Sequence, residues 1–456
     1  MTVTPKSAAA ATLAVITAAV GAWPSLPAVA APVDPPTSRP AEPQPVRAFA
    51  FGGGPTPAGY VRVAPAAAYD AGTGFGFEPG ANVTATDKGG DKDPVTSGGS
   101  CSSDAPFFFS AVVPAEGNYR VTVTLGGPAA AVTTVKAELR RLMLEQVRTA
   151  AGEFATRSFV VNVRTPQIAG GGRVKLKAPR ETTDEAWAWD DRITLEFNGS
   201  RPSVCAVRIE RVDVPTVYVL GDSTVCDQSK EPYASWGQML PRMFKPDVAV
   251  ANHAESGETL GSSTGARRLD KVLSLLRPGD FVLVQYGHND MKSKDPNAVQ
   301  TYKAALKDWT RKIKARGGTP VLVTPMNRHR FDGPTVVNTL GEYPDMVRQA
   351  AAEEGVKFID LHAMSKTLYE ALGPKESVRL FKHNADLTEF DGTHHGPYGA
   401  YELAKCVAEG LRRNVPELGK HLADDVAPFD PAKPDPADRF VIPPSPGVTN
   451  RRPLGD

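Results

Sequence analysis

The sequence carries almost no net charge, few cysteines and no glycine loop of the kind that binds phosphates. Its 52 basic and 51 acidic residues leave a formal net charge of +1, whereas nucleic-acid and membrane-surface proteins usually have a strong positive excess. The 4 cysteines include no CxxC pair and no Cys/His cluster at zinc-ligand spacing. The triplets Gly52–Gly54 and Gly170–Gly172 lack the strand, spacing and lysine of a phosphate-binding loop. We therefore expect no nucleic-acid or membrane partner, no metal and no organic cofactor.

The N-terminus has the pattern of a secretory signal. Lys6 gives a weakly positive start, and Ala8–Val20 is an apolar run too short to span a bilayer. Ala28–Ala30 offers a small-x-small cleavage pattern, and no other apolar run is long enough to span, which disfavours a membrane anchor. We expect a signal peptide at 1–30, a proline-rich linker at 31–46 and a secreted protein. In an exported protein disulfides can form, with three possible pairings among Cys101, Cys205, Cys226 and Cys406.

Residues 47–213 have the pattern of an all-β domain. Short runs that alternate apolar and polar residues are separated by Gly, Pro or Asn, as in antiparallel sandwiches. The expected strands are Phe107–Val113, Tyr119–Leu125, Thr133–Ala137, Ser158–Val163, Arg173–Lys177 and Ile193–Phe197. We predict a jelly-roll-like β-sandwich in which Arg140–Val147 is the one candidate helix. Trp187 and Trp189 would share one face of a strand, where they would form either a sugar-stacking platform or part of the core.

Residues 214–425 change to alternating strands and helices. The expected strands are Thr216–Leu220, Val248–Asn252, Phe281–Tyr286, Pro320–Thr324 and Lys357–Asp360. The expected helices are Trp236–Phe244, Ala266–Leu276, Ala298–Arg316, Tyr343–Glu354, Met364–Leu372 and Tyr398–Asn414. Continuously apolar strands between helices predict a three-layer α/β/α, flavodoxin-like domain with about five parallel strands. The proline-rich tail 426–456 is expected to be a linker or a disordered end.

Polar residues gather where the strands of this second region are expected to end. Ser223 follows the first strand through Gly221, which permits a tight turn. His253–Gly257 and Gly287–Asp290 follow the second and third strands, and Asp391–His395 precedes the last helix. Because right-handed crossovers bring the carboxyl ends of parallel strands to one edge, these segments should be neighbours in space.

The chemistry that fits this edge is attack by a serine on a carbonyl. A serine hydroxyl needs an adjacent base, so His394 would take the proton of Ser223 while Asp391 holds the imidazole ring. The backbone N–H groups of Ser223 and Gly257 and the side-chain amide of Asn289 would stabilise the oxyanion.

The order of these blocks resembles the SGNH (GDSL-type) hydrolase superfamily over about Val217–Leu411. The blocks are Gly-Asp-Ser, a glycine after the second strand, Gly-x-Asn-Asp and Asp-x-x-His before the last helix. The resemblance implies that Ser223 is the nucleophile, Gly257 and Asn289 are oxyanion donors, and His394 and Asp391 are the base and its partner. Five segments are similar in sequence to rhamnogalacturonan acetylesterases: GDSTVCDQ, SWGQML, NHAESGETL, GHNDMK and DGTHHGPYGAYELA.

That resemblance implies a serine esterase that removes acetyl groups from the rhamnogalacturonan backbone of pectin, with an acetylated polysaccharide as its partner. Gly257 is followed by Glu-Thr-Leu, which differs from the usual family sequence at this point. Acetylxylan, another acetylated glycan or a lipid ester therefore remain alternative substrates. A catalytically silent, secreted carbohydrate-binding protein is the alternative from another class. Thr224, His288 and His395 are candidate substrate contacts, with His395 expected in a groove wall or at the surface. Oligomeric state is not readable.

Overall fold

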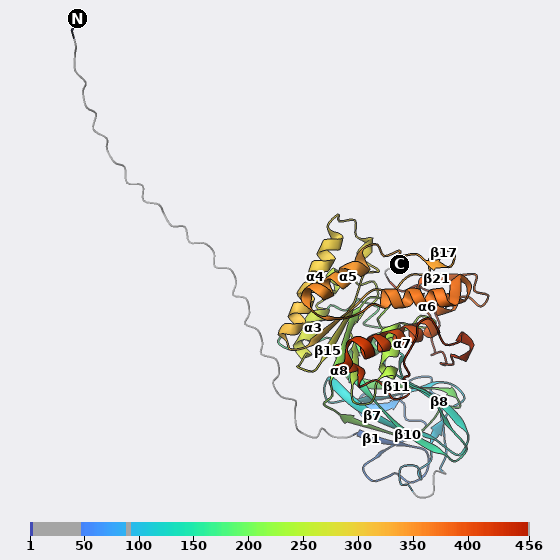
Figure 1. Ribbon diagram of the computed structural model, residues 1–456. Helices are drawn as coiled ribbons and strands as arrows, with labels where there is room; N and C mark the ends of the chain where they lie inside the picture. The colour runs from blue at the N-terminus through green and yellow to red at the C-terminus, as the bar shows by residue number, and fades with distance from the viewer. Residues whose placement is uncertain (3–46, 88–92, 455–456) are drawn as a thin grey trace. The chain divides into compact units, whose positions relative to one another are not determined.

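The computed structural model describes residues 1–2, 47–87 and 93–454 and has a β region followed by an α/β region (Figure 1). The expected signal peptide and linker lie outside the described residues, apart from residues 1–2. The β region ends with β12 at Arg211, and the α/β region begins with β13 at Thr216. From Arg47 onward the described residues belong to one compact unit. This two-part architecture confirms the predicted fold class.

The β region consists of two sheets that are almost entirely antiparallel. One has the order β10-β7-β12-β1-β2, with β5 beside β12 and β4 beside β5, and the other has the order β3-β6-β11-β8-β9. The strands of the first sheet are β1 (Arg47–Phe51), β2 (Val61–Val63), β4 (Thr84–Ala85), β5 (Cys101–Ser102), β7 (Gly117–Gly126), β10 (Phe154–Val163) and β12 (Ser203–Arg211). Those of the second are β3 (Phe75–Phe77), β6 (Phe107–Val112), β8 (Ala131–Ala137), β9 (Arg141–Thr149) and β11 (Arg192–Ser200). Alternate residues of both sheets bury a core in which Phe49, Phe51, Phe107, Phe109 and Phe197 are fully enclosed.

Three local predictions for the β region are wrong. Arg140–Val147 is not helical, because Arg141–Thr149 pairs with β8 as strand β9 and buries Leu142 and Met143. This tertiary pairing outweighs a sequence of good helix formers. Arg173–Lys177 is not a strand and contributes only one bridge, from Arg173 to Gln167.

The tryptophan pair also differs from its prediction, since it lies in the short helix η1 (Ala186–Trp189) rather than in a strand. Trp189 is buried, with the guanidinium of Arg164 4.6 Å from the centre of its ring. Trp187 packs against Phe108, with ring centres 5.5 Å apart. Of the two readings, the core role fits these contacts.

The α/β region contains a parallel sheet in the order β14-β13-β15-β16-β19. Numbered along the chain this is 2-1-3-4-5, the flavodoxin-like order. Its strands are β13 (Thr216–Gly221), β14 (Ala249–Asn252), β15 (Phe281–Gln285), β16 (Thr319–Val323) and β19 (Lys357–Ile359). Two short hairpins accompany it: β17 (Phe331–Asp332) with β18 (Thr335–Val336), and β20 (Phe381–His383) with β21 (Phe390–His395).

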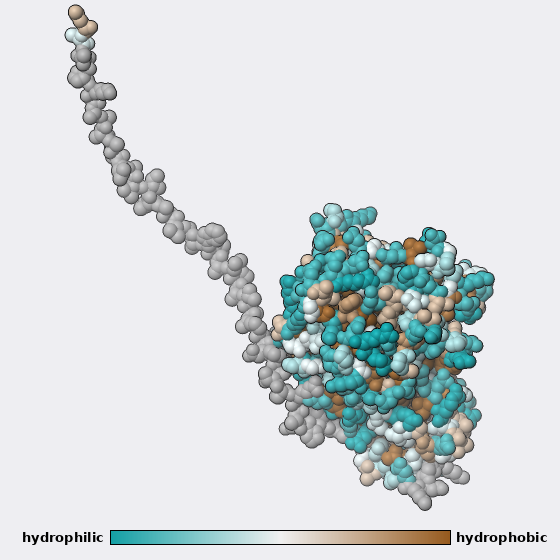
Figure 2. Space-filling model, in the orientation of Figure 1, coloured by the Kyte–Doolittle hydropathy of each residue, from teal (hydrophilic) through white to brown (hydrophobic). Residues whose placement is uncertain are grey.

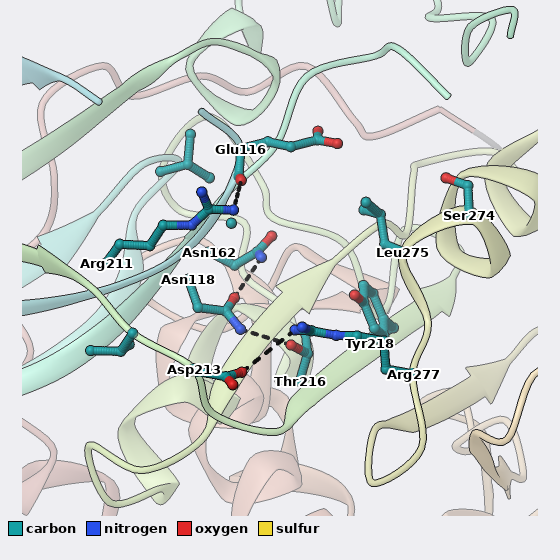
Figure 3. A pocket seen from close by; sticks show the side chains of 13 residues that line it. Glu116, Asn118, Asn162, Arg211, Asp213, Thr216, Tyr218, Ser274, Leu275 and Arg277 are labelled. Carbon is teal, nitrogen blue, oxygen red and sulfur yellow. Dashed lines mark hydrogen bonds and ion pairs between the residues drawn. The ribbon is translucent and has the colours of Figure 1, made fainter. Parts of the chain in front are cut away.

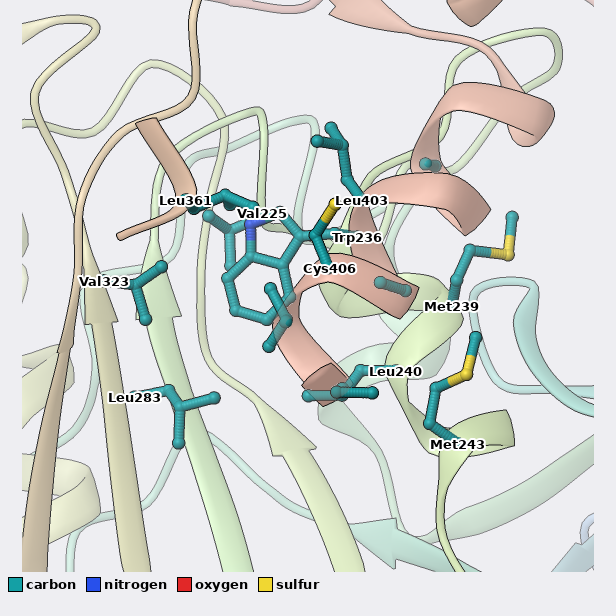
Figure 4. Packing of buried hydrophobic residues seen from close by; sticks show 14 of the residues in the cluster. Val225, Trp236, Met239, Leu240, Met243, Leu283, Val323, Leu361, Leu403 and Cys406 are labelled. Atoms are coloured by element: carbon teal, nitrogen blue, oxygen red, sulfur yellow. The ribbon is translucent and has the colours of Figure 1, made fainter. Parts of the chain in front are cut away.

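Helices cover both faces of the parallel sheet. The helical segments are α1 (Trp236–Met239), η2 (Leu240–Met243), α2 (Leu260–Gly265), α3 (Arg268–Leu275), η3 (Asp290–Lys292), α4 (Ala298–Ala315), α5 (Tyr343–Glu354), α6 (Leu361–Glu376), η4 (Ser377–Leu380), α7 (Pro397–Asn414), α8 (Pro416–Gly419) and η5 (Ala437–Arg439). Val217 and Val219 of β13 point to the side of α1, α6 and α7, where Trp236 is fully buried (Figure 4). Tyr218 and Leu220 point to the side of α3, α4 and α5. Successive strand residues face opposite sides, so both faces are apolar.

The tail 426–456 is not the linker or disordered end that its composition suggests, as far as it is described. Phe429 is buried in the core of the α/β region, and Ser445 is buried against the β region. The buried Lys136 donates from Nζ to the carbonyl of Pro443 and to the Ser445 hydroxyl, both at 2.7 Å. Val448 then forms a bridge with Glu231 of the α/β region. The packing partners of the tail are distant in sequence, which is why the composition of the tail does not predict that it is packed.

The four cysteines are free and buried, so the disulfides considered for an exported chain do not occur in this structure. Among the described residues, no helix combines the length and apolarity needed to cross a membrane. Figure 2 shows that the displayed face is covered mostly by hydrophilic residues, with apolar ones scattered among them.

The two regions meet at a polar junction near the amino end of β13. Asn162 donates from Nδ2 to Oδ1 of Asn118, and Asn118 donates from Nδ2 to the Thr216 hydroxyl, each at 2.8 Å (Figure 3). A hollow of about 260 Å³ lies beside these groups and is also lined by Arg211 and Asp213. Because β13 runs from Thr216 to Gly221, this hollow lies at the opposite end of the strand from Ser223.

Candidate active site

Ser223 lies in a tight loop directly after β13. A Cβ atom at Gly221 would lie 2.6 Å from Cγ2 of Val225 and 2.7 Å from the carbonyl oxygen of Gln285, so only glycine fits there. Oδ1 of Asp222 accepts hydrogen bonds from the backbone N–H of Thr224, at 2.9 Å, and from its hydroxyl, at 2.8 Å. The aspartate therefore fixes the loop that presents the serine, as its position before Ser223 suggests.

A continuous hydrogen-bonded chain joins Ser223, His394 and Asp391. Oγ of Ser223 lies 2.9 Å from Nε2 of His394, and Nδ1 of the same ring lies 3.0 Å from Oδ2 of Asp391. All three are buried, with exposed fractions of 3%, 2% and 2%. The Tyr233 ring and the imidazole are nearly perpendicular, at 86°, with ring centres 6.0 Å apart. The structure thus brings together the three residues predicted to perform the proton transfer, although Ser223 and His394 are 171 positions apart.

The carboxyl group of Asp391 is held in its charged form. Burial by itself raises the pKa of this group, but hydrogen bonds and the charge of His394 outweigh burial and set the pKa well below the usual range. Oδ1 accepts from the backbone N–H groups of Thr393 at 2.9 Å and His394 at 3.0 Å. This leaves Oδ2 to accept from the imidazole, which fixes the ring so that Nε2 faces the serine.

The two predicted oxyanion residues outside the serine loop lie on neighbouring loops. Gly257 follows β14 with a φ of +74°, in the left-handed region that favours glycine. Asn289 follows β15 and donates from Nδ2 to the carbonyl of Glu258, next to Gly257, at 3.0 Å. One Nδ2–H of Asn289 remains for another acceptor, since an amide nitrogen carries two.

Asp290 ties these two loops together. Its carboxyl group accepts from the backbone N–H of Leu260 at 2.9 Å and from that of Gly287 at 3.1 Å. Burial raises the pKa of Asp290 to about 7. These contacts give Asp290 a structural role in both loops.

Thr224 and His288, predicted as substrate contacts, are buried and hydrogen-bonded to the serine loop or to the segments beside it. Thr224 is hydrogen-bonded to Asp222 and accepts from Nε2 of Gln285 at 2.8 Å. His288 lies with Nε2 3.1 Å from the carbonyl of Met326 and with Nδ1 3.5 Å from Oδ2 of Asp222. The exposed fraction of each side chain is 2%, similar to those of Ser223 and His394.

His395 is likewise a core residue, not the groove wall or surface residue that was expected. Its Nε2 lies 2.8 Å from the hydroxyl of Tyr369, and its ring stacks on Phe381 with centres 4.5 Å apart. Burial, together with the nearby charge of His394, lowers the pKa of His395 to about 3. It is therefore neutral at ordinary pH and packs the β20–β21 hairpin against α6.

Two hollows lie beside the triad, and sequence patterns did not identify most of their lining. One, of about 350 Å³, is lined by Lys177 and Arg180 of the β region, by Gln228–Lys230 and Tyr233, and by the C-terminal residues Thr449 and Arg451–Leu454. The other, of about 400 Å³, is lined by Tyr233, Asp391, Lys382, Asn450 and Arg452, among others. Loops carry no periodic signal, and the composition of the C-terminal segment predicts a tail, so only the fold reveals these walls.

Within the described part of the chain, no group of three or more His, Cys, Asp or Glu side chains has the arrangement of a metal site. What the arrangement of Ser223, His394 and Asp391 can do is transfer a proton from a buried hydroxyl as that oxygen attacks an ester carbonyl.

Comparison with known proteins gives two family matches. Residues 219–382 match the GDSL-like lipase/acylhydrolase family. Residues 47–169 match the galactose-binding domain-like family of β-agarase and YXIM-esterase-like proteins. The two matches fall on the α/β region and the β region, respectively.

Several relatives come from Bacillus subtilis. Rhamnogalacturonan acetylesterase RhgT is 40% identical over 219 residues, which are 46% of this chain and 92% of the relative. The probable rhamnogalacturonan acetylesterase YesY is 30% identical, over 46% of this chain and 96% of the relative. The uncharacterized esterase YxiM is 28% identical over 394 residues, 82% of this chain and 92% of the relative. The crystal structure of YxiM has a TM-score of 0.43 at 25% identity and covers 81% of this chain and 98% of its own.

Proposed function

We propose that this chain is secreted and deacetylates the rhamnogalacturonan backbone of pectin through a Ser223–His394–Asp391 triad. The premise is that the chain belongs to the rhamnogalacturonan acetylesterase-like group of the GDSL-like lipase/acylhydrolase family and is a carbohydrate acetylesterase. The observation that carries the proposal is the hydrogen-bonded chain from Oγ of Ser223 through His394 to Asp391, at 2.9 and 3.0 Å.

Hydrolysis would proceed through an acetyl-enzyme. Oγ of Ser223 attacks the acetyl carbonyl while its proton passes to Nε2 of His394, and the carbonyl oxygen becomes an oxyanion. The backbone N–H groups of Ser223 and Gly257 and the amide of Asn289 are the proposed oxyanion donors. The tetrahedral intermediate collapses, the bond to the sugar oxygen breaks, and that oxygen takes the proton from His394. Water then attacks the acetyl-serine as His394 takes its proton, the bond between the acetyl carbon and Oγ of Ser223 breaks, Oγ takes the proton back from His394, and acetate leaves.

A substrate that carries carboxylates is favoured by the basic residues beside the triad. The hollow of about 350 Å³ is lined by Lys177, Arg180, Lys230, Arg451 and Arg452 and by one acidic residue, Asp184. Four of these five cations have acidic partners. Lys177 pairs with Glu258 at 2.9 Å, Arg180 with Glu185 at 2.5 Å, Lys230 with Asp184 at 3.0 Å and Arg452 with Asp391 at 3.8 Å. The lining nevertheless suits the uronate units of a pectin backbone better than the neutral backbone of xylan. Similarity to RhgT supports the same substrate.

The experiment that tests the substrate and the triad together is acetate release from acetylated rhamnogalacturonan, acetylxylan and a short chromogenic acetate ester. We expect the highest kcat/KM on rhamnogalacturonan and loss of activity on all three in Ser223→Ala. Preference for acetylxylan would overturn the substrate but not the triad. Undiminished hydrolysis by Ser223→Ala would overturn the triad, and a wild-type protein inactive on every ester would indicate a silent binding protein.

Secretion rests on the N-terminal pattern and has its own test. The full chain, expressed in a bacterial host, should appear in the medium or periplasm with a shortened N-terminus, which N-terminal sequencing would place near Ala31. Replacing two residues of the apolar run Ala8–Val20 by lysine should retain the protein in the cytoplasm. Equal export of this variant would contradict the proposal.

A further inference from the structure

Three arginines of the β region are buried against the back of the catalytic loops. Arg140 and Arg141 lie where β9 begins, and Arg164 follows the end of β10. Their exposed fractions are 7%, 2% and 4%. A buried guanidinium is stable in a protein only when acceptors surround it. Most of the acceptors that these arginines have belong to the loops that carry the triad and the oxyanion donors, while Arg141 also donates to the carbonyl of Asn162. One guanidinium nitrogen of Arg140, one of Arg141 and two of Arg164 have no hydrogen-bond acceptor among the described residues.

Arg141 is connected to both loops through two side chains. Its Nε donates to Oδ2 of Asp227 at 2.6 Å, and Asp227 lies at the end of the serine loop. Oδ1 of Asp227 accepts from Nδ2 of Asn252 at 2.8 Å. The same Nδ2 donates to the carbonyl of Val225, within the serine loop, at 2.9 Å. Asn252 is the last residue of β14, from which the Gly257 loop departs. One carboxylate and one amide thus link Arg141 to both loops.

Arg164 contacts the same point from the other side. Its Nη2 donates to the carbonyl oxygen of Asn252 at 2.5 Å. The guanidinium of Arg164 also lies over the ring of Trp189, which limits the directions in which it can move. Asn252 is therefore held at its side chain through Asp227 and at its backbone by Arg164.

Arg140 fixes the segment that follows the serine loop. It donates from Nη1 to the carbonyls of Gln228 at 3.0 Å and Tyr233 at 2.9 Å, and it forms an ion pair with Glu231. Gln228 in turn donates from Nε2 to the carbonyl of Ser223 at 2.8 Å.

The turn that presents Arg140 and Arg141 has an unusual backbone. Glu138 and Arg140 have φ values of +56° and +59°, in the left-handed region that residues other than glycine seldom adopt. The carbonyl of Leu139, between them, accepts from Nε2 of Gln238 in α1 at 2.7 Å. Such strained positions persist where surrounding contacts over-determine them, often next to functional sites. Here those contacts come from Gln238 in the α/β region and from Thr194 of β11, which exchanges hydrogen bonds with Glu138.

We propose that Arg141 is a positioning residue of the acetylesterase, which sets the relative placement of the serine loop and the Gly257 loop through Asp227 and Asn252. The β region then belongs to the catalytic scaffold and is more than an attached sugar-binding module. The inference rests on the proposed roles of Ser223 and Gly257. Arg141 touches no reacting atom, so its effect is expected in kcat and not in the binding of a small substrate.

The test compares Arg141→Met and Arg141→Lys with wild type in the full chain, using a short chromogenic acetate ester. Arg148→Met is the matched control, because Arg148 is exposed on the same strand. Misplacing a catalytic group by about 1 Å can cost about 100-fold in rate, so we expect kcat per folded enzyme to fall about 10- to 100-fold in Arg141→Met. Arg141→Lys, which keeps the charge, should restore part of the loss. KM should change less than about twofold, since binding and transition-state effects separate in this way.

A second measurement separates positioning from general destabilisation. Hydrogen exchange should become faster in peptides covering residues 222–228 and 252–258 of Arg141→Met, and remain unchanged in α4 and α5. If Arg141→Met does not fold, Arg141→Lys decides the question. A folded variant at position 141 with kcat within twofold of wild type overturns the inference. An inactive Ser223→Ala beside a fully active Arg141→Lys would refute only the positioning, whereas an active Ser223→Ala would refute the proposed function itself.

Discussion

The substitution Asp391→Asn tests the orientation of the proposed catalytic base, His394, with almost no change of shape. In the wild type, Oδ1 of Asp391 accepts two backbone N–H groups, and Oδ2 lies 3.0 Å from Nδ1 of His394. In the variant the amide oxygen must keep the two backbone donors, so the amide nitrogen faces the imidazole and donates to Nδ1. The ring proton then resides on Nε2, 2.9 Å from Oγ of Ser223, where it blocks uptake of the serine proton.

The expected loss of rate arises because Nε2 of His394 can no longer accept the serine proton, while the oxyanion donors remain in place. The equivalent Asp→Asn change in a Ser-His-Asp triad lowers kcat about 10⁴-fold, which corresponds to about 5 kcal/mol in the activation free energy. Initial rates on a short chromogenic acetate ester measure this loss. KM should stay close to wild type, because the carboxylate contacts the histidine and not the substrate. Asp386→Asn, an exposed position on the loop before β21, is the control and should keep full activity. A correctly folded Asp391→Asn enzyme within tenfold of wild type would refute this assignment.

Three further outcomes follow from the same structure. Asn289→Ala should lower kcat about 10²- to 10³-fold, the usual effect of losing one oxyanion donor. Asn297→Ala, at an exposed position, should not lower kcat, and equal rates for the two variants would exclude Asn289 from the oxyanion site. His395 titrates at about 3 in the folded protein because of burial, against about 6.5 when unfolded. The unfolded state therefore binds more protons at His395 between these values, so this residue lowers stability with falling pH by about 1.4 kcal/mol per unit. Urea unfolding of His395→Phe at several pH values should show a shallower fall, and parallel slopes would contradict this. A thiol reagent should label almost no cysteine in the native protein and 4 after denaturation, because burial raises the pKa of every thiol; fewer than 4 after denaturation would indicate a disulfide.

The predictable part of the site consists of residues with a local reason for their position. Gly221 and Ser223 lie where an apolar strand ends, and Asp391 and His394 lie in one hairpin. The local sequence around each pair therefore predicts most of its geometry. The parallel sheet then unites these segments by a rule of connection handedness. The five strands and the longer helices were therefore predicted to within a few residues.

The unpredicted part depends on contacts between residues distant in sequence. Strand β9 contains leucine, methionine, glutamate and glutamine, all compatible with a helix, and only its pairing with β8 makes it a strand. The tail has no hydrophobic period, yet Lys136 of the β region binds it. His288 and Thr224 stand in polar loops, where composition cannot distinguish a substrate contact from a buried support.

The adjacent residues His394 and His395 explain how the Asp391–His394 pair comes to lie beside Ser223, which is distant in sequence. Asp391 and His394 form a unit within the β20–β21 hairpin, and the hairpin must dock correctly for Nε2 to face Ser223. His395 provides that docking, because its ring stacks on Phe381 and bonds to Tyr369 of α6. Successive residues of a strand point to opposite sides, so one histidine can face the reaction while the next faces the core. The proposed base His394 lies within hydrogen-bonding distance of a residue 171 positions away, and the neutral, buried ring of His395 beside it fixes that position.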